Sequence, residues 1–151
     1  MATTDKTVVF SDEERAAMKA ASTERRRTRS KGKKDPEELR REGEAEVRAK
    51  LAEMPDDDRA LGEALHALVA DVAPHLVPRT YYGMPAYANE AGKVVCFYKP
   101  RSKFKVRYST FEFDQAAHLD DGAVWPVAYA VTALGDEQLA FLGERVRLAA
   151  S

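Results

Sequence analysis

The chain has 151 residues, of which 44% are hydrophobic and 32% charged, and its net charge is −1. These values are typical of one folded domain with a real core, and they exclude a wholly disordered chain and a strongly basic nucleic-acid binder. A single cysteine, Cys96, excludes an intrachain disulfide and favours a reducing compartment. No secretion signal and no run of 18 apolar residues is visible, so we expect a cytoplasmic protein that contacts no membrane.

The N-terminal segment predicts a tail followed by a helix. Residues 1–9 lack a folding pattern, whereas Ser11 and Glu14 have the spacing of a capping box. We expect the helix to run from Ser11 to about Thr23. Its apolar face consists mainly of alanines, so we expect it to pack weakly.

A basic run, Arg25–Lys34, follows this helix and contains seven cations. It is either an arm that binds nucleic acid or an acidic partner, or a hydrated helix end and linker. The second interpretation is favoured because short basic runs commonly remain solvated. We therefore divide the chain into an N-terminal extension, residues 1–34, and a main domain, residues 35–151.

The main domain begins with two predicted helices. Asp35 followed by Pro36 is typical of a helix start, and this helix ends at Met54. Asp56 opens the next helix, which carries an apolar stripe and ends before Pro74. We expect the two helices to form a hairpin that lies on the segments that follow.

A sheet is predicted after these helices, because β-branched and aromatic residues then dominate. Short extended segments, Thr80–Tyr82 and Pro85–Asn89, flank a predicted bend at Gly83-Met84-Pro85. A turn then leads into a strand at Lys93–Lys99. We expect another strand at Lys103–Ser109, because every odd position from Lys99 to Arg107 is basic and period two would place these cations on one face.

The C-terminal third completes the prediction. Residues 114–119 predict a short helical turn, and the alternating pattern from Ala123 to Val131 predicts a final strand, at a sheet edge because of Pro126. Gly135-Asp136 opens a last helix. The fold class predicted is α+β, with one antiparallel β-sheet packed against the N-terminal helices and a C-terminal helix.

Three segments of the chain resemble the YdhG-like family, also called domain of unknown function 1801. They are Tyr82-Gly83-Met84-Pro85-Ala86-Tyr87, Gly92-Lys93-Val94-Val95-Cys96-Phe97 and Gly122-Ala123-Val124-Trp125-Pro126. The resemblance covers about the last two-thirds of the chain, from Asp56 onward. It implies an α+β fold, and it implies iron handling, since some members of the family are described as frataxin-like iron chaperones.

An iron site would need oxygen-rich ligands, so the acidic residues are the metal candidates. They are Asp57, Asp58, Asp120 and Asp121. Each also has a local structural explanation, because aspartates at a helix start complement the helix dipole and Asp-Asp-Gly is typical of a turn. The spacing matches no known metal motif, and the structural explanation is favoured at both places.

Aromatic residues near the predicted bend form either part of the core or the wall of a ligand pocket. The pocket candidates are Tyr82, Met84, Tyr87, Phe97 and Trp125, with Lys103, Lys105 and Arg107 at the mouth. Apolar walls with a few convergent polar groups are typical of small-ligand sites. Core packing is favoured, because aromatic side chains dominate most cores.

No catalytic residue is predicted, since the sequence contains no nucleophile grouping or phosphate-binding loop and Cys96 lies in an apolar strand. The function predicted is a non-enzymatic small-ligand binding or carrier protein, with iron handling added by the resemblance. The alternative is a module that binds nucleic acid or an acidic partner through Arg25–Lys34 and the cationic strand face.

Overall fold

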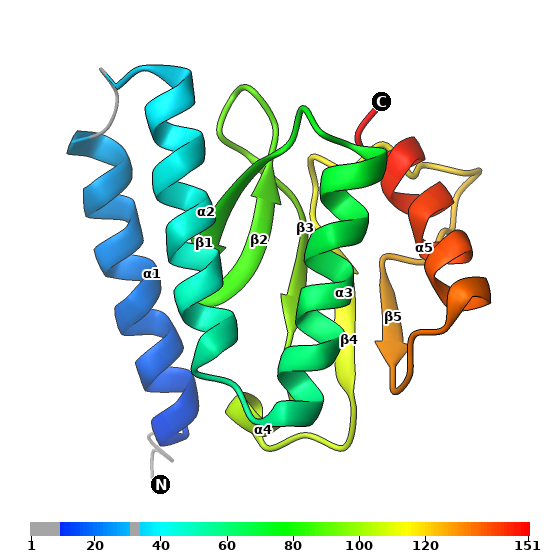
Figure 1. Cartoon of the computed structure of the whole chain (residues 1–151), viewed down its shortest axis with the longest axis horizontal. Helices are drawn as coiled ribbons and strands as arrows, with labels where there is room; N and C mark the ends of the chain where they lie inside the picture. The colour runs from blue at the N-terminus through cyan, green and yellow to red at the C-terminus, as the bar shows by residue number, and fades with distance from the viewer. Residues whose placement is uncertain (1–9, 31–33) are drawn as a thin grey trace, which may run out of the picture.

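The computed structural model describes residues 10–30 and 34–151 of the chain (Figure 1). The predicted tail, residues 1–9, and part of the basic run lie outside the described residues. The helices are α1 (Asp12–Ser30), α2 (Pro36–Ala52), α3 (Asp56–Val72), α4 (Arg101–Phe104) and α5 (Asp136–Ala149), and the strands are β1 (Val77–Tyr81), β2 (Met84–Ala88), β3 (Val94–Lys99), β4 (Ser109–Phe113) and β5 (Ala128–Val131).

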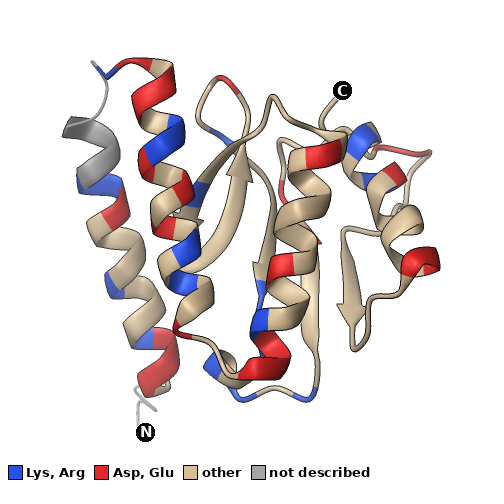
Figure 2. Ribbon diagram, viewed as in Figure 1, with Lys and Arg blue, Asp and Glu red and all other residues tan. Residues whose placement is uncertain are grey.

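The five strands form one antiparallel sheet in the order β1-β2-β3-β4-β5. Helices α2 and α3 cover one face of this sheet, α1 lies beside α2, and α5 packs against α3 (Figure 1). Few of the charged residues lie on the strands (Figure 2). The prediction of an α+β fold is confirmed. None of the helices in the described part of the chain is both long and apolar enough to cross a membrane.

The core lies between the sheet and the α2, α3 and α5 helices. Its fully buried side chains include Leu65 of α3, Tyr98 of β3 and Phe111 of β4. Cys96 is also fully buried, and burial raises the pKa of its thiol. The thiol is therefore protonated and inaccessible, as predicted.

The helix starts follow the capping pattern of the sequence. The Glu14 amide donates to Ser11 Oγ at 3.1 Å, and the Glu37 amide donates to Asp35 Oδ1 at 3.3 Å. The predicted end of the first helix at Thr23 is wrong, because α1 continues to Ser30. The arginines beyond Thr23 are good helix formers, and no glycine or proline interrupts them.

The predicted bend at Gly83-Met84-Pro85 is displaced by one residue. Tyr82 (φ 51°) and Gly83 (φ 75°) form a two-residue turn in which both residues are left-handed, whereas Met84 and Pro85 belong to β2. In such a hairpin the Thr80–Pro85 pair exchanges no hydrogen bonds, so the missing N–H of proline leaves the ladder intact.

The predicted strand at Lys103–Ser109 is wrong. Arg101–Phe104 forms the short helix α4, Lys105 follows it in a left-handed conformation (φ 52°), and β4 begins only at Ser109. Two hydrogen bonds from distant residues hold this turn, because Asp58 Oδ2 accepts from the Ser102 amide and Ser109 Oγ accepts from the Arg101 amide. The cations therefore do not share one strand face.

The last predicted strand is shorter than expected. Only Ala128–Val131 pairs with β4, together with one hydrogen bond from the Phe113 amide to the Val127 carbonyl at 2.7 Å. Pro126 lacks the N–H that would extend the ladder. Residues 114–119 contain the predicted turn, which a hydrogen bond from the Ala117 amide to the Asp114 carbonyl closes at 2.9 Å, and the His118 amide donates to the Ala149 carbonyl at 2.9 Å.

Candidate functional site

Two grooves flank α2 in the described part of the chain. The outer groove, about 700 Å³, lies between α2, β1 and the β2–β3 turn, with Glu24 of α1 at its wall. The α2–α3 groove, about 520 Å³, lies between those two helices above the core. Arg40 and Pro78 contribute to both.

A chain of three hydrogen-bonded side chains forms the floor and one wall of the α2–α3 groove. His66 of α3 is 7% exposed, and Tyr87 of β2 is 1% exposed. His66 Nδ1 lies 2.8 Å from Tyr87 Oη, and His66 Nε2 lies 2.8 Å from Glu44 Oε1. Arg48 Nε extends the chain with an ion pair to the same Glu44 oxygen at 2.7 Å.

Protonation along this chain follows from burial and pairing. Burial raises the pKa of Tyr87 well above its ordinary value, so its hydroxyl keeps its proton and can donate to His66 Nδ1. Burial also opposes ionisation of Glu44, but its hydrogen bond to His66 and its pairing with Arg48 outweigh that effect and lower its pKa. An ionised Glu44 carries no proton, so it accepts a hydrogen bond from His66 Nε2.

Arginines give the groove an excess of positive charge. Arg40, Arg41 and Arg48 line it against one carboxylate, Glu44. Arg40, Glu44 and Arg48 recur every four residues and therefore lie on one face of α2. Arg40 Nη1 donates to the Leu76 carbonyl at 3.1 Å, and Arg48 Nε pairs with Glu44 at 2.7 Å. These contacts fix the positions of both guanidinium groups but use only some of their N–H donors, so the others can bind a ligand.

The outer groove differs in its chemistry. Arg79, the cation from β1, already donates to the Thr80 carbonyl at 3.1 Å and to the Gly92 carbonyl at 3.2 Å. Glu24 is bound to the Tyr82–Gly83 turn. The α2–α3 groove has a buried imidazole, and the three arginines that line it are exposed to solvent. It is therefore the candidate functional site.

The predicted pocket residues do not converge on one cavity. Tyr87 alone among them lines either of the two grooves. Tyr82 is in the hairpin turn, Met84 is buried, Phe97 packs against Tyr81, and Trp125 packs against the core from the loop before β5. Lys103 donates to the Tyr82 carbonyl, Lys105 pairs with Glu13, and Arg107 lies over Tyr108.

The metal candidates are also dispersed. Asp58 is 1% exposed at the start of α3, whereas Asp57, Asp120 and Asp121 are exposed. Within residues 10–30 and 34–151, no three His, Cys, Asp or Glu side chains group closely enough to hold a metal ion. Asp58 instead joins α3 to α4, by accepting from the Ser102 amide at 3.1 Å.

We expect Asp58→Ala to lower the free energy of unfolding by about 2 kcal/mol, because a partly buried amide loses its acceptor. Asp57→Ala, one residue away and exposed, should change it by less than about 0.5 kcal/mol. Urea denaturation in metal-free buffer measures both. Equal stability of the two variants would contradict the structural role of Asp58.

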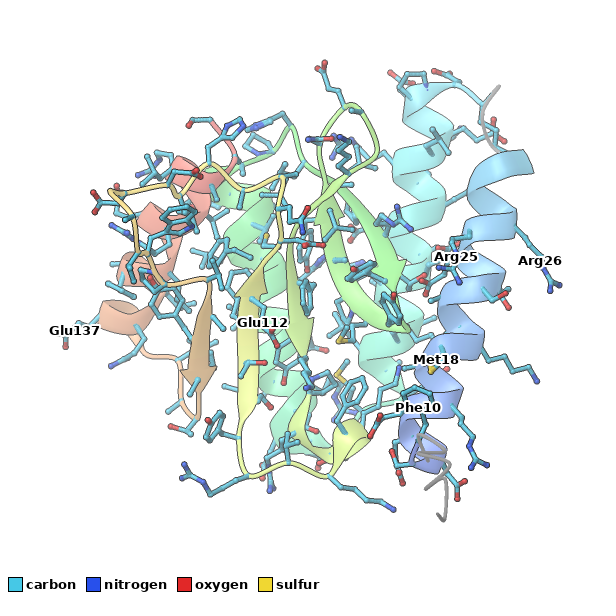
Figure 3. All side chains as sticks on the ribbon, turned by 180° about the vertical axis from the view of Figure 1, so that it is seen from behind. Phe10, Met18, Arg25, Arg26, Glu112 and Glu137 are labelled. Carbon is cyan, nitrogen blue, oxygen red and sulfur yellow. The ribbon has the colours of Figure 1, made fainter. Side chains whose placement is uncertain are left out.

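The alternative nucleic-acid surface retains only part of its predicted basis. Arg25 and Arg26 are exposed on α1, and Arg26 points away from the rest of the molecule (Figure 3). The rest of the cationic surface is lost with the predicted strand, because Lys103 and Lys105 make contacts within the fold. Residues 31–33 of the basic run lie outside the described residues.

Comparisons with protein-family models, curated proteins and solved structures find no match. The resemblance to the YdhG-like family therefore stays a prediction.

Sequence reasoning did not single out the residues of this site, which are Arg40, Arg41, Glu44, Arg48 and His66. The i, i+4, i+8 series on α2 was a usable signal, because it places three charged side chains on one helix face. The partnership with His66 was not visible, since 22 residues separate Glu44 from His66.

Proposed function

We propose that this protein is a non-enzymatic binding protein for a small anionic ligand, which occupies the α2–α3 groove. The observation that carries the proposal is the set of three arginines that line the groove beside the Glu44–His66–Tyr87 chain, whose His66 and Tyr87 are buried. A cytoplasmic location is part of the proposal, supported by the single buried cysteine.

The chemistry of the groove favours a carboxylate or phosphate ligand. Guanidinium groups present several donors in a fixed plane and bind such anions through paired hydrogen bonds. Apolar side chains, among them Val69 and Leu76, line the same groove and would contact the body of a ligand. The buried chain fixes Glu44 and, through it, the Arg48 guanidinium, so the cationic wall is preorganised.

Calorimetric titration with inorganic phosphate, pyrophosphate and succinate tests the proposal. We expect at least one of them to bind the wild-type protein, more weakly as sodium chloride is raised. The double variant Arg41→Gln/Arg48→Gln should weaken binding by about tenfold or more, which corresponds to ~1.4 kcal/mol.

Arg107→Gln serves as the matched control, because Arg107 is exposed and distant in sequence from both groove helices. It should leave the Kd unchanged. Absence of binding by the whole panel, or equal weakening in the control and the double variant, would contradict the proposal.

The iron-carrier function rests on the resemblance, and the nucleic-acid function rests on the exposed arginines of α1. Anaerobic titration with ferrous iron tests the first, and a gel-shift series against salt tests the second. The described part of the chain contains no group of three metal-ligating side chains, and Lys103 and Lys105 of the predicted cationic face make contacts within the fold. We therefore rank both functions below anion binding.

The pH dependence of stability reports whether Glu44 is paired in solution. Because the folded-state pKa of Glu44 is lowered from 4.5, its contribution is present above that pH and is lost as pH falls through the folded-state pKa. We expect the free energy of unfolding of wild type to fall more steeply below pH 4.5 than that of Glu44→Gln. Parallel curves from urea denaturation across this range would show that the pairing is absent.

A further inference from the structure

The turn between β1 and β2 binds a carboxylate supplied by α1. Glu24 Oε2 accepts from the Tyr82 amide at 2.9 Å, and Glu24 Oε1 accepts from the Gly83 amide at 3.0 Å. Two successive backbone N–H groups converge on one carboxylate, as in the backbone concavities that bind anions in other folds. Glu24 is 8% exposed, so this contact is shielded from water.

Lys103 of α4 completes the positive surroundings of this turn. Its Nζ donates to the Tyr82 carbonyl at 3.3 Å and lies 2.2 Å from the position that a Cβ on Gly83 would take. A Cβ there would displace the flexible end of the Lys103 side chain, and the positive φ of Gly83 (75°) also favours glycine. Burial lowers the pKa of Lys103, while the negative charge of Glu24 acts in the opposite direction.

The turn contains a residue that is poorly suited to its conformation. Two-residue turns of this kind favour Asn or Asp followed by Gly, whereas Tyr82 stands at the first position with φ 51°. A left-handed residue with a large side chain costs about 1–2 kcal/mol. Backbone strain of this kind is concentrated at binding sites, and here it aims both amides at the carboxylate.

The described side chains of α1 bury little apolar surface. Among its described side chains, the buried ones are Ala17, Ala21 and Glu24, while Met18 is 45% exposed and Phe10, just before the helix, is 38% exposed (Figure 3). An exposed ion pair between Glu13 and Lys105, at 2.5 Å, adds a second connection and contributes little in water. Of these two polar contacts of the described part of α1, the one made by the Glu24 carboxylate is the better shielded from water.

We propose that Tyr82, Gly83 and Lys103 form a carboxylate-binding site, the carboxylate cradle, which α1 closes with its own Glu24. Helix α1 is then a displaceable strap, and a carboxylate from another molecule occupies the cradle when the strap opens. The cradle shares no residue with the α2–α3 groove, so this inference is independent of the proposed function.

The test removes the internal carboxylate and supplies an external one. In full-length Glu24→Ala, acetate at constant ionic strength should raise the thermal midpoint of unfolding and shift the Gly83 amide signal in NMR spectra, because only the folded state binds acetate. Wild type, whose cradle Glu24 already fills, should respond more weakly, because acetate must first displace that carboxylate. A synthetic peptide of residues 10–26 distinguishes the source of the ligand: tighter binding than acetate indicates a polypeptide carboxylate, and weaker binding a small acid.

Two further variants keep the test decisive if Glu24→Ala is unstable. Glu24→Gln replaces one of the two accepting oxygens by an NH2 group, which only donates hydrogen bonds and cannot accept from a backbone amide. Its thermal midpoint should therefore lie between those of wild type and Glu24→Ala. In Glu24→Ala/Lys103→Met the response to acetate should be lost. The proposal is overturned if wild type and Glu24→Ala respond equally to acetate, or if neither responds. It is also overturned if Glu24→Gln is as stable as wild type, or if the response to acetate survives Lys103→Met.

Discussion

Gly43→Ala is expected to destabilise the protein by about 3 kcal/mol or more, although alanine is the better helix former by about 1 kcal/mol. At Gly43 the backbone of α2 packs directly against the backbone of β1 at Pro78. A Cβ there would lie 1.8 Å from the Pro78 carbonyl oxygen and 2.8 Å from its carbon. Both are backbone atoms of a paired strand, so neither can move aside without shifting β1 or α2. Urea denaturation measures the loss.

Gly143→Ala provides a matched control in another helix. A Cβ at Gly143 would lie 3.3 Å from Leu68 Cδ1 and 3.5 Å from Val72 Cγ1, which are the ends of side chains rather than backbone. These side chains can adjust, so the free energy of unfolding should stay within about 1 kcal/mol of wild type. If Gly43→Ala were as stable as Gly143→Ala, the close approach of α2 to β1 would be wrong.

His66→Leu is expected to lower the free energy of unfolding by about 2–3 kcal/mol, because the buried Tyr87 hydroxyl loses its hydrogen-bond partner. The hydroxyl is fully buried and His66 Nδ1, at 2.8 Å, is its partner in the described chain of hydrogen bonds. Glu44 loses its contact with the imidazole at the same time. The loss is measured as the change in the free energy of unfolding in urea.

Adding Tyr87→Phe to His66→Leu should restore part of this stability. Removing both partners of a buried hydrogen bond costs less than removing one of them. A double-mutant cycle should therefore give a coupling energy of about 1 kcal/mol or more between the two positions. Strictly additive effects would mean that the imidazole and the hydroxyl do not interact.

Much of the fold could be predicted because it is encoded locally. The capping residues Ser11 and Asp35 and the helix terminator Pro74 predicted where helices begin and end, and the apolar stripe of α3 predicted the face that packs on the sheet. The strand at Lys93–Lys99 was predicted to within one residue, because β-branched and aromatic residues are consecutive there.

The errors arose where distant residues decide the local structure. The segment Lys103–Tyr108 alternates between cations and apolar or aromatic residues as a half-buried strand does. Asp58 and Ser109 nevertheless bind the Ser102 and Arg101 amides and stabilise a helical turn at its start. Tertiary hydrogen bonds of this kind override a weak local preference. The candidate site was missed for the same reason, because α2, α3 and β2 each supply one member of the Glu44–His66–Tyr87 chain.

Nitrogen NMR of the imidazole rings tests the proposed binding site most directly. The protein has three histidines, and they report on separate places: His66 lines the α2–α3 groove, His75 lines the outer groove, and His118 lines neither. With inorganic phosphate as the probe, we predict that the His66 signals shift in wild type, that those of His75 and His118 do not, and that Arg41→Gln/Arg48→Gln abolishes the shift. A shift confined to His75 or His118, or a His66 shift that survives loss of both arginines, would contradict anion binding in the α2–α3 groove.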